Sequence, residues 1–287
     1  MELVATASQV RAKVAKARSE GKTIGFVPTM GYLHEGHLAL MRRAREENGY
    51  VVISIFVNPA QFLPGEDYQR YPRDLERDML MAREVPVDLV FAPAVEELYP
   101  PGDSTKVEVR GALMKGLCAP FRPGHFEGVA TVVTKLFNIV QPDRAYFGEK
   151  DYQQLQVIKR LARDLHMPVR VEPVATVREP DGLTMSSRNA YLSPEERRAA
   201  LCLSRALSEA ERLAQGGERE GIAIMKRVRE VIEQEPLVKL EYAELCDPNT
   251  LEEVRTVTGP TLLALAARVG SARLIDNAIL LRRGVDD

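Results

Sequence analysis

Residues 24–44, IGFVPTMGYLHEGHLALMRRA, lead from an apolar run through a turn with two histidines into a helical pattern. The apolar residues 24–27 predict a buried parallel strand, and residues 38–47 predict a helix. His34 and His37 then lie at the start of that helix, where free backbone N–H groups and the helix dipole favour anions. The glycine between them lets a phosphate approach the backbone closely. The pattern predicts a site that stabilises negative charge developing on a nucleotide phosphate during displacement.

Two other interpretations of these histidines stay open. In the zinc-binding pattern His-Glu-x-x-His the ligands lie at positions i and i+4, whereas His34 and His37 are three apart with a glycine between them. His125 and His166 are the remaining histidines, and neither is an evident third ligand. The other alternative is an exposed turn with incidental histidines. Phosphate chemistry is favoured, and it needs support from the rest of the chain.

Composition and charge limit the class of protein. At 287 residues the chain is long enough for one large domain or two ordinary ones. Lys and Arg number 39 against 41 Asp and Glu, and the net charge of −2 argues against bulk nucleic-acid binding. No apolar run approaches the roughly 20 residues that span a bilayer, and no signal peptide is evident. Cys118, Cys202 and Cys246 are widely spaced and odd in number, which predicts reduced thiols of a cytoplasmic protein.

Residues 1–175 alternate between apolar runs and helical patterns, which predicts an α/β domain with a Rossmann-like, doubly wound parallel sheet. The expected strands are 24–27, 51–57, 88–91, 144–147 and 169–171, and the expected helices are 38–47, 75–83, 129–140 and 154–165. Ligands of such sheets bind at the carboxyl ends of the strands, near the point where strand order reverses. Polar clusters follow the first, second and fourth of these strands, so we expect a nucleotide- and substrate-binding site at that edge.

Residues 176–287 predict a smaller α+β lid domain. Ser193 is a predicted N-cap, with Pro194 and Glu196 at the first and third helical positions. The sequence predicts a helix to Gln215, a break at two glycines, and a second helix over 221–234. Extended runs at 240–245, 262–267 and 273–275 predict strands that pair antiparallel.

Two loops in the first domain carry polar side chains that suit a small ligand. In NPAQF, residues 58–62, amide side chains at a strand end can orient a polar substrate, although a plain turn is the alternative. In RPGHF, residues 122–126, Arg122 and His125 can reach an anion, and a purely structural loop is the alternative.

Two further segments are candidates for phosphate binding. In GEKDYQQ, residues 148–154, Lys150 can neutralise a phosphate, whereas the alternative is a surface helix capped by Asp151. In MSSRN, residues 185–189, two hydroxyls and a guanidinium can wrap a triphosphate and a mobile loop can close over it, whereas the alternative is a serine-rich linker. The dinucleotide pattern Gly-x-Gly-x-x-Gly is missing, and the Walker-like GKT at 21–23 precedes a strand instead of following one.

Together and in this order, these motifs resemble the pantothenate synthetases, from about residue 5 to the C-terminus. The His-x-Gly-His turn alone is shared with related nucleotidyltransferases, whereas the NPAQF and GEKDYQQ segments point to this family. The matching segments are PTMGYLHEGH (28–37), FVNPAQF (56–62), RPGHFEGV (122–129), KLFNIVQPDRAYFGEKDYQQL (135–155) and MSSRN (185–189).

The resemblance implies an ATP-dependent ligase that condenses D-pantoate with β-alanine to give pantothenate, AMP and pyrophosphate. Pantoyl adenylate would be the intermediate, Mg²⁺ would accompany ATP, and the protein would be a homodimer. The implied catalytic residues are His34, His37 and Lys150, with His37 as a candidate proton donor. The sequence identifies no protein ligand for the metal, and Asp78 is a weak candidate.

The resemblance also implies binding residues, position by position. Gln61 and Gln154 would bind pantoate. The implied nucleotide-binding residues are Met30, Gly31, Tyr32, Leu33, His34, Glu35, Gly36, His37, Gly148, Glu149, Lys150, Asp151, Val177, Met185, Ser186, Ser187 and Arg188.

Small departures and three rival functions remain. Leu63 stands where the family often has glycine, and Ala119-Pro120 replaces a stretch that commonly contains glycine. An adenylyltransferase of the same superfamily would need a basic cluster for a phosphorylated acceptor, where Gln61 and Gln154 stand instead. A catalytically silent nucleotide-binding module should lack one of the catalytic residues. A zinc hydrolase is the third rival.

Overall fold

The computed structural model describes residues 1–282 and divides them into two compact units. Unit 1 comprises Met1–Val109 and Arg122–Val177, and unit 2 comprises Arg110–Phe121 and the chain from Arg178 onward. The expected boundary near residue 175 lies close to this division, but the segment 110–121 belongs to unit 2 instead of unit 1. The last five residues of the expected lid domain, 283–287, lie outside the described residues.

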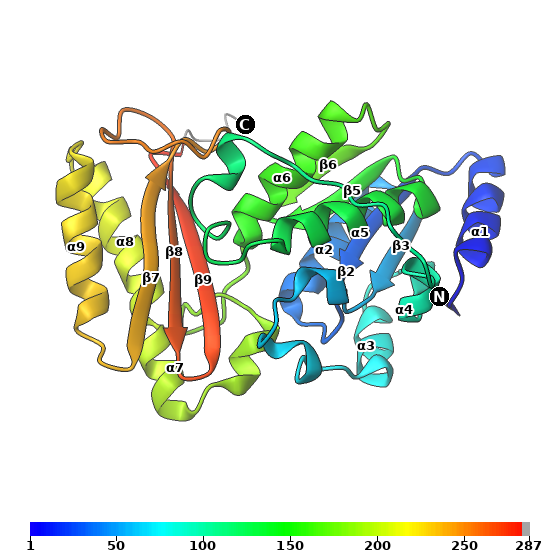
Figure 1. Ribbon diagram of the computed structural model, residues 1–287, viewed down its shortest axis with the longest axis horizontal. Coiled ribbons are helices and arrows are strands. Elements are labelled where there is room, and N and C mark those ends of the chain that lie inside the picture. The colour runs from blue at the N-terminus through cyan, green and yellow to red at the C-terminus, as the bar shows by residue number, and fades with distance from the viewer. Residues whose placement is uncertain (283–287) are drawn as a thin grey trace. The chain divides into compact units, whose positions relative to one another are not determined.

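Within residues 1–282, unit 1 contains a six-stranded parallel sheet with the strand order β1-β4-β3-β2-β5-β6 (Figure 1). The doubly wound arrangement predicted from the alternating pattern is confirmed. The strands are β1 (Glu2–Val4), β2 (Ile24–Thr29), β3 (Tyr50–Ile55), β4 (Leu89–Phe91), β5 (Arg144–Gly148) and β6 (Arg170–Val174). The helices are α1 (Ala7–Ser19), α2 (Glu35–Glu47), α3 (Leu75–Ala82), α4 (Val95–Leu98), α5 (His125–Val140) and α6 (Tyr152–Asp164).

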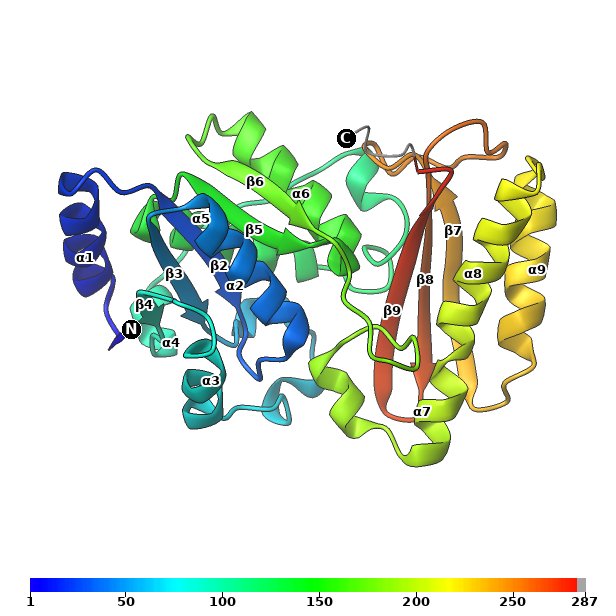
Figure 2. The same ribbon diagram turned by 180° about the vertical axis from the view of Figure 1, so that it is seen from behind.

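Helices cover both sides of this sheet, as Figures 1 and 2 show from opposite directions. One core cluster joins buried side chains of α1, α5 and α6 to Phe26 of β2. The other joins α2 and α3 to Val27 of the same strand. Phe26 and Val27 are successive residues of β2, so their side chains point to opposite faces of the sheet. Both are fully buried, as the continuous apolar run predicted for a sheet covered on both sides.

Two elements at the N-terminus were not anticipated. β1 is a three-residue strand at the edge of the sheet, and α1 follows it with Thr6 and Gln9 forming a capping box. α1 buries only Val10, Val14 and Ala17, so its hydrophobic pattern is weak. β6 begins one residue later than expected and extends to Val174.

Unit 2 contains, within the described part of the chain, a three-stranded antiparallel sheet in the order β7-β8-β9. The predicted antiparallel pairing is confirmed. Helices α8 and α9 bury one face each against this sheet. The elements are α7 (Pro194–Ala200), α8 (Cys202–Gln215), α9 (Gly221–Glu233), β7 (Val238–Cys246), β8 (Thr261–Val269) and β9 (Ala272–Leu280).

The helix predicted from 193 to 215 is interrupted at Leu201, so it forms two helices, α7 and α8. Its predicted start is confirmed, because the Ser193 side chain accepts from the Glu196 N–H and the Glu196 carboxylate accepts from the Ser193 N–H. None of the helices in residues 1–282 combines the length and apolar character needed to cross a bilayer.

The segment 110–121 belongs to unit 2 through specific contacts with β7. The Leu117 N–H donates to the Glu244 carboxylate over 3.1 Å. The Phe121 ring lies 5.7 Å from the Tyr242 ring, centroid to centroid. These contacts join residues more than a hundred positions apart, which sequence periodicity does not register.

Candidate active site

The predicted polar clusters follow three adjacent strands of the unit 1 sheet. β2 pairs with β3 on one side and with β5 on the other, and all three run parallel. The chain order of the strands reverses between β2 and β5, so these two strands flank the switch point at which doubly wound folds bind ligands. His34 and His37 follow β2, Gln61 follows β3, and Lys150 follows β5.

His34 and His37 form the N-terminal cap of α2. The His34 Nδ1 accepts from the Gly36 N–H over 3.2 Å, and the His37 Nδ1 accepts from the His34 N–H over 3.3 Å. The two rings lie 4.1 Å apart, centroid to centroid. The histidines thus occupy the positions of a capping box that serine and glutamate usually fill.

This cap fixes the protonation of both imidazoles. A backbone N–H can only donate, so each Nδ1 carries a lone pair and each neutral ring carries its proton on Nε2. Protonating Nδ1 would place two N–H groups against each other. Burial, together with His34 and the Lys150 ammonium, also holds the pKa of His37 well below its usual value. The helix start therefore presents Nε2–H groups of uncharged imidazoles beside a lysine.

The turn before the histidines is anchored by Asp78 of α3. Its two carboxylate oxygens accept from the Tyr32 N–H over 2.8 Å and from the Leu33 N–H over 2.7 Å. Gly31 has a φ of +78°, and a Cβ there would lie 2.7 Å from the Asp78 carboxylate. The turn therefore requires glycine at this position. The Leu33 side chain is fully buried in the core.

Asp78 is therefore a structural anchor, and its weak candidacy as a metal ligand stays a prediction. The side chain is buried and both oxygens are already engaged by backbone N–H groups. Burial raises the pKa of Asp78, and the two hydrogen bonds oppose that rise. Among residues 1–282 there is no cluster of three or more His, Cys, Asp or Glu side chains that could hold a metal ion. The carboxylate of Glu35 pairs with Arg42 on the same helix.

Residues after β5 form a short 3₁₀ turn, Glu149–Asp151, that leads into α6. The Lys150 Nζ lies 3.8 Å from the Asp151 carboxylate. Asp151 occupies the N-cap position of α6, but its side chain makes no capping hydrogen bond, so the alternative of a helix capped by this carboxylate is wrong. Gln154 lies in the first turn of α6 and is half-buried.

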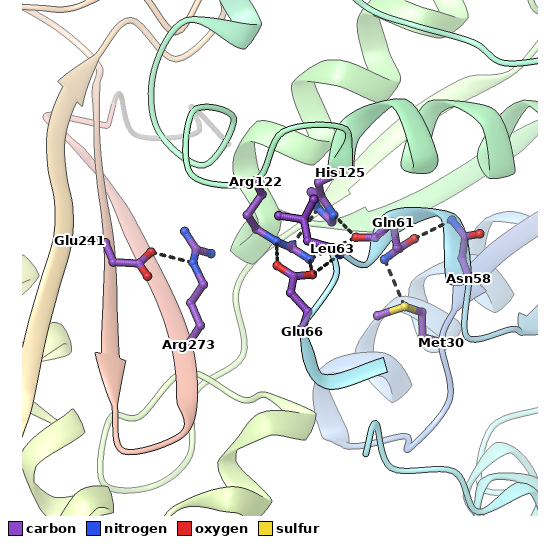
Figure 3. Close-up of polar contacts among 9 residues, drawn as sticks. All are labelled: Met30, Asn58, Gln61, Leu63, Glu66, Arg122, His125, Glu241 and Arg273. Atoms are coloured by element: carbon purple, nitrogen blue, oxygen red, sulfur yellow. Dashed lines mark hydrogen bonds and ion pairs between the residues drawn. The ribbon is translucent and has the colours of Figure 1, made fainter. Parts of the chain in front are cut away.

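The Gln61 amide is held at both of its ends, as Figure 3 shows. Its Nε2 donates to the Met30 sulfur over 3.1 Å, and its Oε1 accepts from the Asn58 Nδ2 over 3.1 Å. Asn58 is buried, and its Oδ1 accepts from the Tyr99 hydroxyl over 2.8 Å. A Cβ at Gly128 of α5 would lie 2.2 Å from the Ala60 carbonyl oxygen, so α5 and this loop are in direct contact.

Arg122 and His125 make hydrogen bonds within the protein, which agrees with the alternative of a structural loop. Arg122 pairs with Glu66 through two hydrogen bonds of 2.7 and 2.6 Å. The His125 Nδ1 lies 2.8 Å from the Gln61 carbonyl oxygen. No sequence motif pointed to Glu66, because a glutamate in a Gly/Pro-containing loop is usually solvated.

Other predicted nucleotide-binding residues are divided between the units. Val177 ends unit 1, whereas Met185, Ser186, Ser187 and Arg188 belong to unit 2. Ser186 caps the 3₁₀ helix Ser187–Tyr191 by accepting from the Arg188 N–H over 3.3 Å. Ser187 is only 8% exposed. The segment is therefore a capped helical turn, and its role in binding a triphosphate stays a prediction.

A doubly wound sheet with two histidines and a lysine at its switch point is typical of enzymes that act on nucleotide phosphates. The particular family follows from sequence. A family model described as pantoate-beta-alanine ligase matches residues 2–279. The chain therefore belongs to the pantoate-beta-alanine ligase family.

Individual relatives agree with this assignment. The pantothenate synthetase of Pelotomaculum thermopropionicum is 59% identical over 275 residues, which cover 96% of this chain and 97% of the relative. The crystal structure of pantothenate synthetase from Thermus thermophilus matches with a TM-score of 0.92 at 51% identity, over 97% of this chain and 99% of that chain. Pantoate-beta-alanine ligase from Francisella tularensis, complexed with beta-gamma ATP and beta-alanine, matches with a TM-score of 0.78 at 32% identity, over 97% of each chain.

Proposed function

We propose that this chain condenses D-pantoate with β-alanine in an ATP-dependent reaction that proceeds through pantoyl adenylate. Family membership over residues 2–279 supports the overall reaction. The single structural observation that carries the adenylate step is the pair of Nε2–H donors of His34 and His37 beside Lys150 at the switch point.

The proposed reaction has two steps, adenylation of pantoate and amide formation. A carboxylate oxygen of pantoate forms a bond to the α-phosphorus of ATP, the bond to the bridging oxygen breaks, and pyrophosphate leaves. The amine of β-alanine then forms a bond to the activated acyl carbon, loses a proton, and expels AMP. Adenylation is needed because oxide is a very poor leaving group from a free carboxylate.

His34 and His37 act in the first half-reaction as neutral hydrogen-bond donors. Their Nε2–H groups and the Lys150 ammonium stabilise the negative charge on the phosphate oxygens as pyrophosphate departs. Neutral donation replaces our expectation that His37 donates a proton, because its Nδ1 is engaged as an acceptor and its pKa is lowered by burial first of all. The N-terminus of α2 adds the favourable end of a helix dipole.

The remaining residues bind the substrates in this proposal. Gln61 and Gln154 hold the hydroxyl and carboxylate groups of pantoate through their amides. The family resemblance assigns nucleotide binding to the turns 30–37 and 148–151, to Val177 and to the segment 185–188. Gln61 suits this role because, among residues 1–282, its Nε2 donates to the Met30 thioether, a weak acceptor that a substrate oxygen displaces.

Three further expectations belong to this proposal. The described residues do not fit a protein-held Mg²⁺, since they lack an acidic cluster, so Mg²⁺ arrives on the phosphate oxygens of ATP. The active protein is a homodimer, which sedimentation equilibrium tests. The reaction takes place in the cytoplasm, consistent with the burial of Cys118, Cys202 and Cys246, none of which forms a disulfide within the described residues.

Pyrophosphate release tests the proposed function directly. The protein is mixed with Mg-ATP and D-pantoate, first without β-alanine and then with it. We expect a single-turnover burst of pyrophosphate, followed by steady AMP production once β-alanine is added. Folded protein that releases no pyrophosphate under either condition would contradict the assignment.

A further inference from the structure

The loop from Gln61 to Glu66 is tied to the start of α5 by three side chains, Glu66, Arg122 and His125 (Figure 3). The Arg122 Nε and Nη2 donate to the two Glu66 oxygens over 2.7 and 2.6 Å. Glu66 also accepts from the Leu63 N–H over 3.0 Å. The Arg122 side chain is 12% exposed and that of Glu66 is 22% exposed, so this is a largely desolvated ion pair.

Both Arg122 and His125 converge on one atom, the carbonyl oxygen of Gln61. The His125 Nδ1 lies 2.8 Å from it and the Arg122 Nη2 donates to it over 3.2 Å. Arg122 also donates through Nη1 to the His125 Nε2 over 3.1 Å. A carbonyl accepts and a guanidinium donates, so the imidazole is neutral with its proton on Nδ1. Each nitrogen and oxygen atom named in this network therefore acts either as a hydrogen-bond donor or as an acceptor.

Asn58 and Met30 hold the side chain of Gln61. Glu66, Arg122 and His125 additionally hold the main chain of Gln61. The hydrogen bonds of these three side chains go to the Gln61 carbonyl and to the loop that follows it. They therefore affect substrate binding through the position of Gln61. A small displacement of a substrate-orienting side chain is enough to weaken binding strongly.

We propose that Glu66, Arg122 and His125 are positioning residues that set the affinity for the hydroxy-acid substrate by holding Gln61. The proposal rests on the proposed function, in which Gln61 binds pantoate. Arg122 and His125 contact the Gln61 carbonyl directly. Glu66 acts indirectly, because its charge keeps Arg122 in place.

The first test replaces Glu66 by Gln, which keeps the shape and removes the charge. We expect Glu66→Gln to raise the KM for pantoate by about tenfold, the effect of weakening a charge-assisted hydrogen bond, with the KM for ATP unchanged. The matched control is Glu127→Gln on α5, which removes the exposed ion pair between Glu127 and Lys106. The control is expected to leave both KM values unchanged.

The second test separates the hydrogen bond from packing. His125→Ala removes the donor to the Gln61 carbonyl, whereas His125→Asn keeps an N–H near the position of Nδ1. We expect the alanine variant to raise the KM for pantoate by about tenfold and the asparagine variant to restore most of the affinity. If the alanine variant does not fold, Glu66→Gln and His125→Asn still decide the matter.

The positioning role and the proposed ligase function fail in different ways. A wild-type protein that releases no pyrophosphate with pantoate overturns both. An active wild type whose Glu66→Gln variant keeps its KM for pantoate, or raises the KM for ATP equally, overturns the positioning role alone.

Discussion

Three imidazoles in this protein are held uncharged by their hydrogen bonds, and they use opposite tautomers. His34 and His37 accept at Nδ1 and present Nε2–H, whereas His125 donates from Nδ1 and accepts at Nε2 from Arg122. The sequence predicted the phosphate role of the first two from their place at a helix start. It did not predict their tautomers, because these depend on backbone N–H groups that only the folded turn brings within reach.

Substitutions of His37 separate hydrogen-bond donation from proton donation. We expect His37→Ala to lower the rate of pyrophosphate release by about 10²-fold or more, since it removes one donor to developing charge. His37→Gln should recover part of that rate, because a neutral amide N–H donates and its oxygen still caps α2. Single-turnover pyrophosphate release from pH 6 to 9 measures both variants. Equal inactivity of the two, with loss of a pH-dependent limb near neutrality, would establish a proton donor instead.

The stability of the protein should fall on acidification because of His125. Burial, with the Arg122 charge, lowers the pKa of His125 to about 4, against 6.5 for an ordinary histidine, although Gln61, Glu66 and Asp151 oppose the shift. Between these values the unfolded chain binds a proton that the folded chain does not, so stability is full above pH 6.5 and is lost as the pH falls toward 4.

The contribution amounts to at most about 3 kcal/mol of unfolding free energy. Urea unfolding between pH 7 and 4.5 measures it, with His125→Asn as the comparison. The variant should lose less stability over this interval than the wild type does. His37 contributes in the same direction in both proteins, since its pKa is also lowered. Parallel stability curves for the two proteins would mean that His125 is not the group responsible.

At the scale of elements, hydrophobic patterning predicted most of the sheet and its helices, but not β1, α1 or α4, and it did not predict the contacts that hold the turns. Asp78 illustrates the reason. It lies on a short amphipathic helix, where an acidic residue usually faces solvent, and its partners Tyr32 and Leu33 are 46 and 45 positions away along the chain. Glu66 and Arg122 are likewise 56 positions apart. Patterns within a short window cannot register such pairs.

Replacing Asp78 by Asn should loosen the turn before the histidines. An asparagine keeps one acceptor oxygen but turns an NH₂ group toward a buried backbone N–H, so we expect a loss of about 2 kcal/mol in stability. We also expect a higher KM for ATP, because the turn 30–37 is displaced. Urea unfolding and steady-state kinetics measure the two effects.

The control for Asp78→Asn is Glu76→Gln, an exposed acidic residue in the first turn of the same helix. It should change neither stability nor the KM for ATP. An Asp78→Asn variant with wild-type stability would show that the two hydrogen bonds do not hold the turn.

For the molecule as a whole, the change of pattern near residue 175 predicts two domains, but nothing in the sequence assigns residues 110–121 to unit 2. This stretch has no regular periodicity apart from one 3₁₀ turn, Ala112–Met114. Its attachment to Tyr242 and Glu244 depends on the bulged strand β7, whose pairing with β8 joins residues far from this stretch in the sequence.

A fragment covering residues 178–287 should therefore be less stable than the same fragment joined to residues 110–121 by a flexible linker. Without the segment, Tyr242 loses its aromatic partner and Glu244 loses the Leu117 N–H. We expect the thermal midpoint, followed by circular dichroism, to be lower by at least about 5 °C. Identical midpoints would show that the segment adds nothing to the fold of unit 2.

The capping arrangement of His34 and His37 has a consequence for how this protein can change over generations. Active sites are commonly costly to stability, so a random replacement there often strengthens the fold while it weakens the chemistry. Here the same two side chains complete the start of α2 and face the nucleotide phosphates in the proposed reaction. Selection for a stable fold and selection for turnover then both act on these positions, and a replacement that can neither cap the helix nor donate, such as alanine, weakens the fold and the chemistry together.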